Sequence, residues 1–216
     1  GGSFSTRRVV AIQHGRPIFN LAASFQVEEP GVEHQAQMAD VPGPDGLKDF
    51  SDISDEQLEK LPEKMRRFLT AKRPFEIRPV TPVSFLEPIQ LPPVKQVWFR
   101  AVDALPDELA LHQNLLAYVS DYELLGTSTL PHGLPFGQGK VIMASLDHAL
   151  WFHRRVRVDE WLLYAMDSRY AGGARGFARG QVFTESGELV ASTAQEGLVR
   201  VVEKAKTDRT DPRLQA

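Results

Sequence analysis

The chain has 216 residues, of which 42% are hydrophobic and 25% charged, and its formal net charge is -3. This length supports one large domain or two small ones, and the charge gives no reason to expect nucleic acid or an anionic membrane surface as a partner. The absence of cysteine excludes disulfides, thiolate nucleophiles and zinc–thiolate sites. Because the sequence has no run of 18 apolar residues and no signal-peptide pattern, a cytoplasmic protein is expected, with no membrane partner.

The front of the chain predicts a β-hairpin followed by a linker. Two extended runs, 4–13 and 18–27, flank a glycine-containing turn at 14–17. Residues 28–53 are rich in Pro, Gly and Asp and show no periodicity, which is typical of a linker or surface loop. The hairpin and the next regular element are therefore expected to be separated by irregular chain.

The next segment, 55–72, predicts a helix. It is acidic at its start and basic at its end, the charge order that the helix macrodipole favours. Pro62 lies inside it, and a proline in a helix interior removes a hydrogen bond and clashes with the preceding turn. We therefore expect the helix to be interrupted or kinked at Pro62.

The rest of the chain predicts one helix against an antiparallel sheet. The helix is expected to begin after Leu105, at Pro106 and Asp107, and to end near Gly126, with apolar residues at the 3.6-residue period. A loop over 127–139 then leads to the later strands. The predicted strands are 75–80, 96–103, 140–153, 161–171, 174–184 and 189–202. The fold class is α+β.

An internal repeat connects the two ends of the chain. "SFSTRRVVAIQHGRPIFNLAASFQ" and "GFARGQVFTESGELVASTAQEG" each contain a strand with arginine, a glycine turn, and a strand running through Ala and Ser to Gln. The first copy shows only this hairpin, which is not stable alone in water, so we expect the front of that copy to be missing. The expected domains are 1–27 as the last hairpin of the first copy, 28–74 as a linker with a helix, 75–205 as a complete second copy, and 206–216 as a polar tail.

Six blocks of the chain together carry a family resemblance: "SFSTRRVVAIQHGRPIFNLAASFQ", "HQNLLAYVSDYELL", "MASLDHALWFHR", "DEWLLYAMDS", "ARGFARG" and "STAQEGLVR". In this order they closely resemble the type II acyl-CoA thioesterases of the TesB kind. The resemblance implies a double hot-dog fold, in which each of two copies has a long helix wrapped by an antiparallel sheet; here the first copy is incomplete. It implies hydrolysis of fatty acyl-CoA to free acid and CoA, with no cofactor or metal and with homo-oligomeric assembly.

The resemblance also implies three catalytic residues. They are Asp121 on the helix, Ser145 on the following strand and Gln195 on the last strand. The family usually has threonine where Ser145 stands, so the hydroxyl is kept and a methyl group is lost. The implied reaction is direct hydrolysis: Asp121 accepts a proton from a water that the other two residues position, and this water attacks the thioester carbonyl.

Without the resemblance, the same residues leave alternatives open. Asp121, close to a helix C-terminus and flanked by Tyr118 and Tyr122, fits either a solvated terminal turn or a general base, because the macrodipole disfavours an anion there. Gln195 falls on the less charged face of the last strand, where its amide needs partners such as a carboxylate and a bound water, or else it lies at the rim of the sheet. Ser145 also fits an ordinary strand serine.

Other residues suggest competing chemistry. Asp147 and His148 form a rival acid–base pair, for which a buried structural role, hydrogen-bonding backbone, is favoured. His112 would suit a hydratase or dehydratase, but it precedes Asp121 by about two and a half helical turns. The sequence contains no G-x-S-x-G elbow and no H-E-x-x-H metal-ligand motif.

The remaining candidates concern substrate binding. Five arginines could meet the CoA phosphates, although an ordinary charged surface or intramolecular ion pairs are favoured for each: Arg154, Arg155, Arg157, Arg175 and Arg179. Four aromatic residues are expected in the core rather than in an acyl tunnel: Trp151, Phe152, Trp161 and Phe183. The alternative function is a non-catalytic acyl-CoA-binding or assembly module.

Overall fold

The computed structural model describes residues 2–82, 89–134 and 141–202. The chain divides into two compact units, Gly1–Gln35 and Ala36–Ala216. Within the described residues no helix is long and apolar enough to cross a membrane. The predicted polar tail lies outside the described residues.

The first unit is the predicted hairpin, with a tighter turn than expected. Strand β1 (Phe4–Gln13) pairs antiparallel with β2 (Arg16–Gln26), and Gln13 faces Arg16 across the ladder. Only His14 and Gly15 form the turn, with φ of 49° and 75°. Two consecutive residues with positive φ match the twist of a two-residue hairpin, so the predicted turn over 14–17 is too long.

The predicted helix over 55–72 consists of two short helices. Helix α1 spans Asp55–Glu59 and α2 spans Glu63–Thr70. Pro62 is the N-cap residue of α2, so the predicted interruption is confirmed. The N–H group of the residue before a helix makes no intrahelical hydrogen bond. Proline, which lacks this N–H group, is therefore tolerated there.

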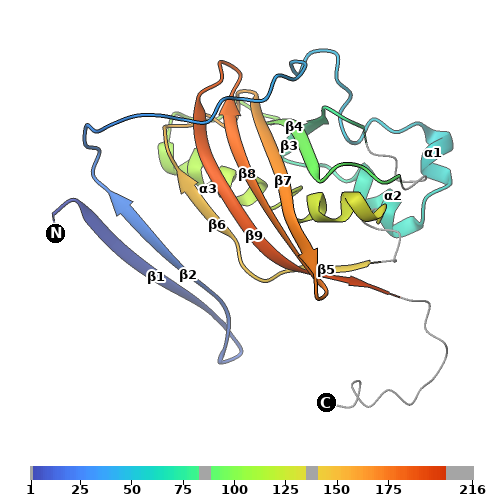
Figure 1. Cartoon of the computed structure of the whole chain (residues 1–216), viewed down its shortest axis with the longest axis horizontal. Helices are drawn as coiled ribbons and strands as arrows, with labels where there is room; N and C mark the ends of the chain where they lie inside the picture. The colour runs from blue at the N-terminus through green and yellow to red at the C-terminus, as the bar shows by residue number, and fades with distance from the viewer. Residues whose placement is uncertain (1, 83–88, 135–140, 203–216) are drawn as a thin grey trace. The chain divides into compact units, whose positions relative to one another are not determined.

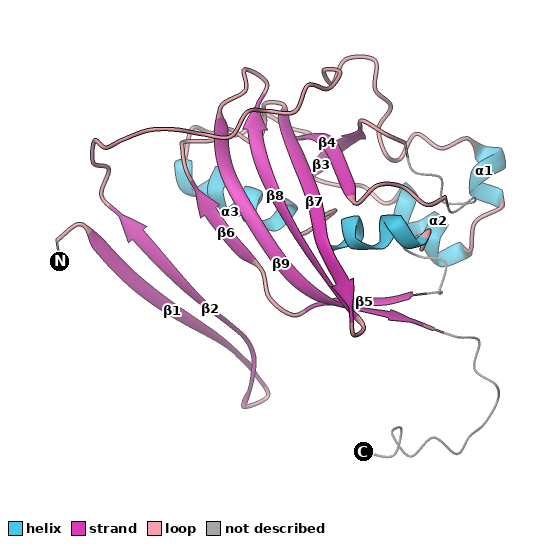
Figure 2. Ribbon diagram, in the orientation of Figure 1, coloured by secondary structure: helices cyan, strands magenta, loops and turns pink. Residues whose placement is uncertain are grey.

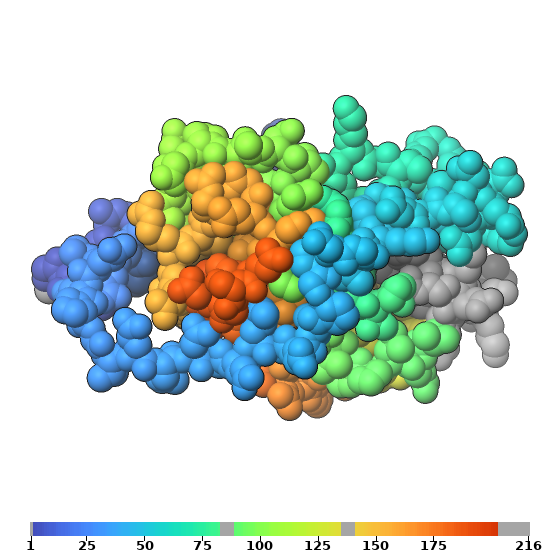
Figure 3. Space-filling view, turned by 90° about the horizontal axis from the view of Figure 1, so that it is seen from above, coloured from blue at the N-terminus to red at the C-terminus, as the bar shows by residue number. Residues whose placement is uncertain are grey.

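The second unit already begins within the predicted linker. The indole Nε1 of Trp98 donates to the carbonyl of Pro42 at 2.8 Å, and the Phe50 N–H donates to the Ile77 carbonyl at 2.7 Å. Three apolar side chains of this segment pack against Trp98, Leu163 and Phe183: Met38, Val41 and Leu47. Figure 3 shows the segment after Ala36, in blue, lying against the orange and red strands.

A single curved antiparallel sheet dominates this unit (Figures 1 and 2). Its strand order is β3-β4-β7-β8-β9-β5, and β6 also pairs with β9. The strands are β3 (Phe75–Pro79), β4 (Val94–Ala101), β5 (Val141–Ser145), β6 (Ala149–Phe152), β7 (Leu162–Gly172), β8 (Arg175–Thr184) and β9 (Leu189–Val201). Strand β9 therefore has β8 along one edge and both short strands along the other, which makes it central to the candidate site.

One face of the sheet packs against helix α3 (Leu109–Val119). Leu116 and Val119 of this helix join the main apolar cluster with residues of β4, β7 and β8. The 3₁₀ helix η1 (Leu125–His132) follows, where the start of a loop was predicted. It approaches β9 closely, because a Cβ added at Gly197 would lie 2.2 Å from Leu125 Cδ2.

The predicted strand over 140–153 is wrong in one respect, because a β-bulge divides it into β5 and β6. Ser145 pairs with Gly197, whereas Ala149 pairs with Ala194. Between these two pairs the segment 145–149 advances by four residues while β9 advances by three, so one residue is extra. The N–H groups of residues 146 and 147 both donate to the Glu196 carbonyl. A bulge breaks the in–out alternation of side chains, so strand periodicity could not predict where residues 146–148 point.

Candidate active site

Asp121 lies just beyond helix α3, not on it. The helix ends at Val119, Ser120 is its C-cap, and the Tyr122 N–H donates to the Val119 carbonyl at 3.0 Å. The Asp121 side chain is 53% exposed. The expectation of a helix-borne acid is corrected accordingly: Asp121 occupies the turn after the helix, where its carboxylate can reach both solvent and strand β9.

The register of the sheet explains why Ser145 and Gln195 meet. Ser145 is the last residue of β5 and faces Gly197 across the ladder. Directly paired residues point to the same side of a sheet, and so do residues two apart on one strand. Ser145, Gly197 and Gln195 therefore share a face, and Gly197 has no side chain to separate the other two.

The three residues predicted from the resemblance form one hydrogen-bonded cluster. Gln195 Nε2 donates to Asp121 Oδ1 at 2.5 Å and to Ser145 Oγ at 2.8 Å. The Ser145 hydroxyl donates to the same Asp121 oxygen at 3.4 Å. Residues 74 positions apart in the chain, Asp121 and Gln195, are thus in direct contact.

Gln195 is held in one orientation within the sheet. Its side chain is buried, and Oε1 has no hydrogen-bond partner among the described residues. Turning the amide over would place that oxygen against the Asp121 carboxylate, where two acceptors would repel each other. Asp121 is the partner that the sequence predicted, but the second donor bond goes to Ser145, where a water was expected.

The hydrogen bonds from Gln195 and Ser145 to Asp121, called the clamp below, leave one side of Asp121 open. Within the described part of the chain, every hydrogen bond to the Asp121 carboxylate ends on Oδ1. The second oxygen, Oδ2, is the one that can face solvent on this exposed side chain. A carboxylate with one oxygen anchored and the other accessible has the geometry of a general base acting on water.

A buried network holds the turn that carries Asp121. The Tyr164 hydroxyl donates to the Ser120 carbonyl at 2.8 Å and lies 2.7 Å from Thr193 Oγ1. Burial raises the pKa of Tyr164; the Thr193 hydrogen bond acts in the opposite direction, and the Asp121 carboxylate raises it slightly further. Tyr164 is therefore a neutral donor that ties this turn to strands β7 and β9.

Tyr122, the residue after Asp121, also stays neutral. Its hydroxyl donates to Tyr118 Oη at 2.6 Å. Burial first, and this hydrogen bond second, raise the pKa of Tyr122 to about 12. The tyrosine beside Asp121 therefore cannot replace it as a base near neutral pH.

The rival pair Asp147 and His148 separates in the structure. Asp147 Oδ1 accepts the backbone N–H of Glu196 at 2.8 Å, a backbone role as favoured, although Asp147 is exposed and not buried. His148 turns instead toward the site: its Nε2 lies 2.9 Å from Ser120 Oγ, and its Nδ1 lies 4.0 Å from Asp121 Oδ1. His148 therefore faces Asp121 and not its neighbour in sequence, Asp147. In an unbroken strand residues 147 and 148 would point to opposite faces, and the bulge changes this alternation.

His112 does not support hydratase chemistry. Its side chain is 1% exposed, and its Nδ1 accepts the Val158 N–H at 3.2 Å. The 3.9 Å approach of the same nitrogen to Asp159 is therefore not a charge pair, because that nitrogen carries no proton. In the described ranges, no group of three or more His, Cys, Asp or Glu side chains could hold a metal ion.

Three of the five candidate arginines form intramolecular ion pairs, one of the two roles favoured from the sequence. Arg157 pairs with Asp159, Arg175 with Glu196 and Arg179 with Asp167. Among the four aromatic residues, Phe183 is buried in the core as expected. Trp151 and Phe152 are 53% and 40% exposed, so the prediction that they lie in the core is wrong.

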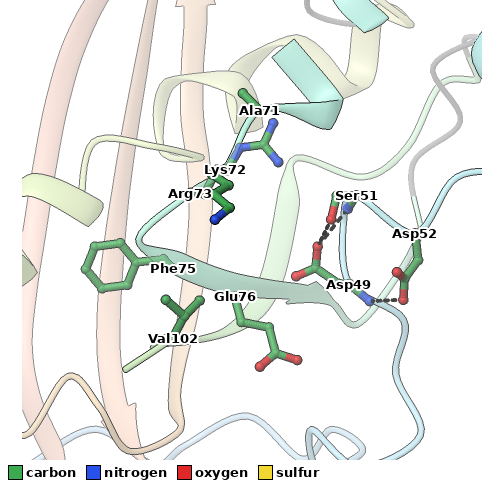
Figure 4. A pocket seen from close by; sticks show the side chains of 9 residues that line it. All are labelled: Asp49, Ser51, Asp52, Ala71, Lys72, Arg73, Phe75, Glu76 and Val102. Atoms are coloured by element: carbon green, nitrogen blue, oxygen red, sulfur yellow. Dashed lines mark hydrogen bonds between the residues drawn. The ribbon is translucent and has the colours of Figure 1, made fainter. Parts of the chain in front are cut away.

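A surface hollow elsewhere in the second unit contains none of the three predicted residues (Figure 4). Its acidic groups are already occupied: Asp49 accepts from Ser51 and from the Ile77 N–H, and Glu76 pairs with two arginines. The lining residues are Asp49, Ser51, Asp52, Ala71, Lys72, Arg73, Phe75, Glu76 and Val102. The hydrogen-bonded cluster around Asp121 is therefore the stronger candidate for chemistry.

Comparison with known proteins places the chain in a family. The family profile described as acyl-CoA thioesterase matches residues 66–198, more than half of the chain. This chain belongs to the acyl-CoA thioesterase family. The matched range includes Asp121, Ser145 and Gln195, and the resemblance stated from the sequence is confirmed.

Members of this thioesterase family cover most of the chain. Human acyl-coenzyme A thioesterase 8 is 40% identical over an alignment of 210 residues, which covers 93% of this chain and 65% of that protein. The crystal structure of acyl-CoA thioesterase II TesB2 from Mycobacterium marinum has a TM-score of 0.74 and 41% identity, covering 95% of this chain and 72% of that one. The chain thus spans about two thirds of the length of its relatives.

A more distant structure identifies the fold. A hot-dog-fold protein of unknown function from Alicyclobacillus acidocaldarius is 17% identical with a TM-score of 0.67, covering 93% of this chain and 69% of that one. Together with the thioesterase structure, it confirms the predicted hot-dog fold. In this chain, the curved antiparallel sheet packed against α3 shows this architecture.

Proposed function

We propose that this protein hydrolyses fatty acyl-CoA to free fatty acid and CoA, with Asp121 as the general base. The observation that carries the proposal is the hydrogen-bonded convergence of Asp121, Ser145 and Gln195 within a chain of this family. The human and Mycobacterium marinum relatives named above are acyl-CoA thioesterases. The chain spans 65% of the human relative, so both activity and substrate belong to this proposal.

The proposed reaction is direct attack by water. Asp121 takes a proton from a water molecule while the oxygen of that water forms a bond to the thioester carbonyl carbon. The carbon–sulfur bond then breaks, and CoA leaves as a thiolate that takes up a proton. Because thiolates are good leaving groups, the step needs a base more than it needs a strong acid.

The clamp on Asp121 suits this role. Gln195 and Ser145 both bond to Oδ1, which supports Oδ2 as the atom that receives the proton. Gln195 is buried and donates its amide hydrogens to Asp121 and Ser145. Its part in the mechanism is therefore to position these two residues. Ser145 is an exposed residue whose hydroxyl contacts both Asp121 Oδ1 and Gln195 Nε2, so it can help to position the water beside the carboxylate.

The test is release of CoA thiol from palmitoyl-CoA and decanoyl-CoA. The chain contains no cysteine, so a thiol reagent reports only free CoA. Asp121→Asn keeps the shape of the side chain but cannot accept the proton, and kcat should fall roughly 10²- to 10⁴-fold. Asp103→Asn, at an exposed aspartate outside the cluster, is the matched control and should be as active as the wild type.

The alternative, a non-catalytic acyl-CoA-binding module, gives a different result in the same assay. Acyl-CoA would bind without thiol release, and Asp121→Asn would change nothing. Such an outcome would contradict the proposed hydrolysis. Cytoplasmic location and homo-oligomeric assembly remain predictions from the sequence.

A further inference from the structure

His148 is a titratable side chain close to Asp121 that the mechanism above does not use. The bulge between β5 and β6 turns it toward the end of α3, and its Nδ1 lies 4.0 Å from Asp121 Oδ1. Its other ring nitrogen, Nε2, lies 2.9 Å from Ser120 Oγ. Bulges beside active sites commonly redirect one side chain, which is what is seen here.

The hydrogen bonds of Ser120 decide which nitrogen of His148 carries the proton. The Ser120 hydroxyl has one hydrogen and donates it to the Ala117 carbonyl at 3.0 Å. At the contact with His148 the serine oxygen must therefore accept, and Nε2–H of the histidine donates. The neutral ring is left with its lone pair on Nδ1, the nitrogen that faces Asp121.

Two acceptors therefore face each other across 4.0 Å when Asp121 is ionised. Asp121 acquires a proton on Oδ2 when it deprotonates water. A half-turn of its exposed carboxyl group exchanges the two oxygens, so that the proton then faces Nδ1 and can form a hydrogen bond to it. The exposed Asp121 side chain can rotate to close the gap, and catalytic hydrogen bonds that are long in the free enzyme often tighten when substrate binds. Ser120 is 1% exposed, so the anchor of the ring is rigid.

We propose, on the basis of the proposed function, that His148 is a positioning residue that acts through Asp121 by taking over its proton. After water attack, the proton on Asp121 moves to His148 Nδ1, which regenerates the carboxylate beside an imidazolium. The imidazolium then loses the proton to solvent, to which the 23% exposed side chain is open. No bond other than O–H and N–H changes in this step, and no further reactant is needed.

The decisive variant is His148→Gln. Glutamine can still donate an amide hydrogen to Ser120, but it cannot take up a proton. We expect kcat for palmitoyl-CoA hydrolysis to fall by roughly 100-fold, with KM unchanged, because a positioned acid–base group commonly contributes at least this much. His148→Ala should lose a similar factor and regain part of its kcat when free imidazole is added, which a purely structural residue would not do.

A second histidine offers a matched control. His153 Nε2 lies 2.8 Å from Ser192 Oγ, so His153→Gln breaks the same kind of histidine–serine contact away from Asp121. Its kcat should equal that of the wild type. Urea unfolding of all variants shows whether any loss of kcat comes from loss of the fold.

The outcomes separate this inference from the function on which it rests. A wild-type protein that releases no thiol refutes both. An active wild type with a fully active His148→Gln variant refutes the role of His148 alone. The role is also refuted if His148→Ala is inactive and imidazole restores nothing.

Discussion

Replacing Gln195 with leucine tests the clamp on Asp121 most directly. Leucine has a similar volume, fits a buried strand position, and removes both amide donors together with the unpartnered Oε1. Asp121 and Ser145 keep their places in the chain but lose the group that joins them. We expect a variant that folds normally and hydrolyses acyl-CoA poorly.

The effect on stability follows from opposing contributions. The lost hydrogen bond to an ionised carboxylate is worth about 1.5–3 kcal/mol where water cannot replace it, but the 53% exposed Asp121 can be rehydrated. Removing a buried, unpartnered oxygen recovers about 1–3 kcal/mol, and the leucine methyl groups add favourable apolar burial. The free energy of unfolding should therefore change by no more than about 1–2 kcal/mol in either direction.

The effect on activity is much larger, because Asp121 lies in an exposed turn. Without the Gln195 donor, only the long 3.4 Å bond from Ser145 restrains the carboxylate within the cluster. A displacement of about 1 Å in a reacting group can cost roughly 10²-fold in rate. We expect kcat to fall roughly 10²- to 10³-fold.

Two measurements decide the matter: thiol release from palmitoyl-CoA and unfolding in urea. Gln181→Leu, at a half-buried glutamine on the neighbouring strand β8, makes the same chemical change outside the cluster and should leave kcat unchanged. A Gln195→Leu variant with kcat within about threefold of the wild type would show that the clamp does not serve catalysis. A loss of more than about 3 kcal/mol in the free energy of unfolding would show that the glutamine is mainly structural.

Three further substitutions test a buried carboxylate and the packing of the second unit. Burial acts to raise the pKa of Asp159, but backbone hydrogen bonds and Arg157 outweigh it and lower the pKa below its usual value. Asp159→Asn should therefore lower the free energy of unfolding by about 2 kcal/mol at pH 7, and urea unfolding should show this difference shrinking below about pH 4, as the wild-type carboxylate takes up its proton. Gly180→Ala would place a Cβ 2.3 Å from Tyr164 Cε2; we expect about 1–3 kcal/mol of destabilisation in urea and a lower kcat, because Tyr164 holds the turn that carries Asp121. Leu116→Ala, at a position with no exposed surface, should lower the free energy of unfolding by about 2–5 kcal/mol, measured in the same way.

Sequence patterns predicted the regular elements because those depend on local periodicity. Strands β8 and β9 begin and end within a residue of their predicted limits, and the proline that divides the early helical segment does so as expected. Elements whose limits depend on distant contacts were predicted less well. The early loop packs onto the sheet through Trp98, a contact 56 residues away in sequence that no local pattern shows.

Through its resemblance to a known family, the sequence predicted the hot-dog fold, the family and a catalytic role for Asp121, Ser145 and Gln195. Only the tertiary structure decided how they meet, because hydrogen bonds over 24 to 74 residues of sequence depend on strand register. It also placed Asp121 beyond its helix and, through one extra residue in a bulge, turned His148 toward it and away from Asp147. A bulge changes the direction of every side chain after it without changing composition or hydrophobicity, so its effect on a site becomes visible only when the strands are paired.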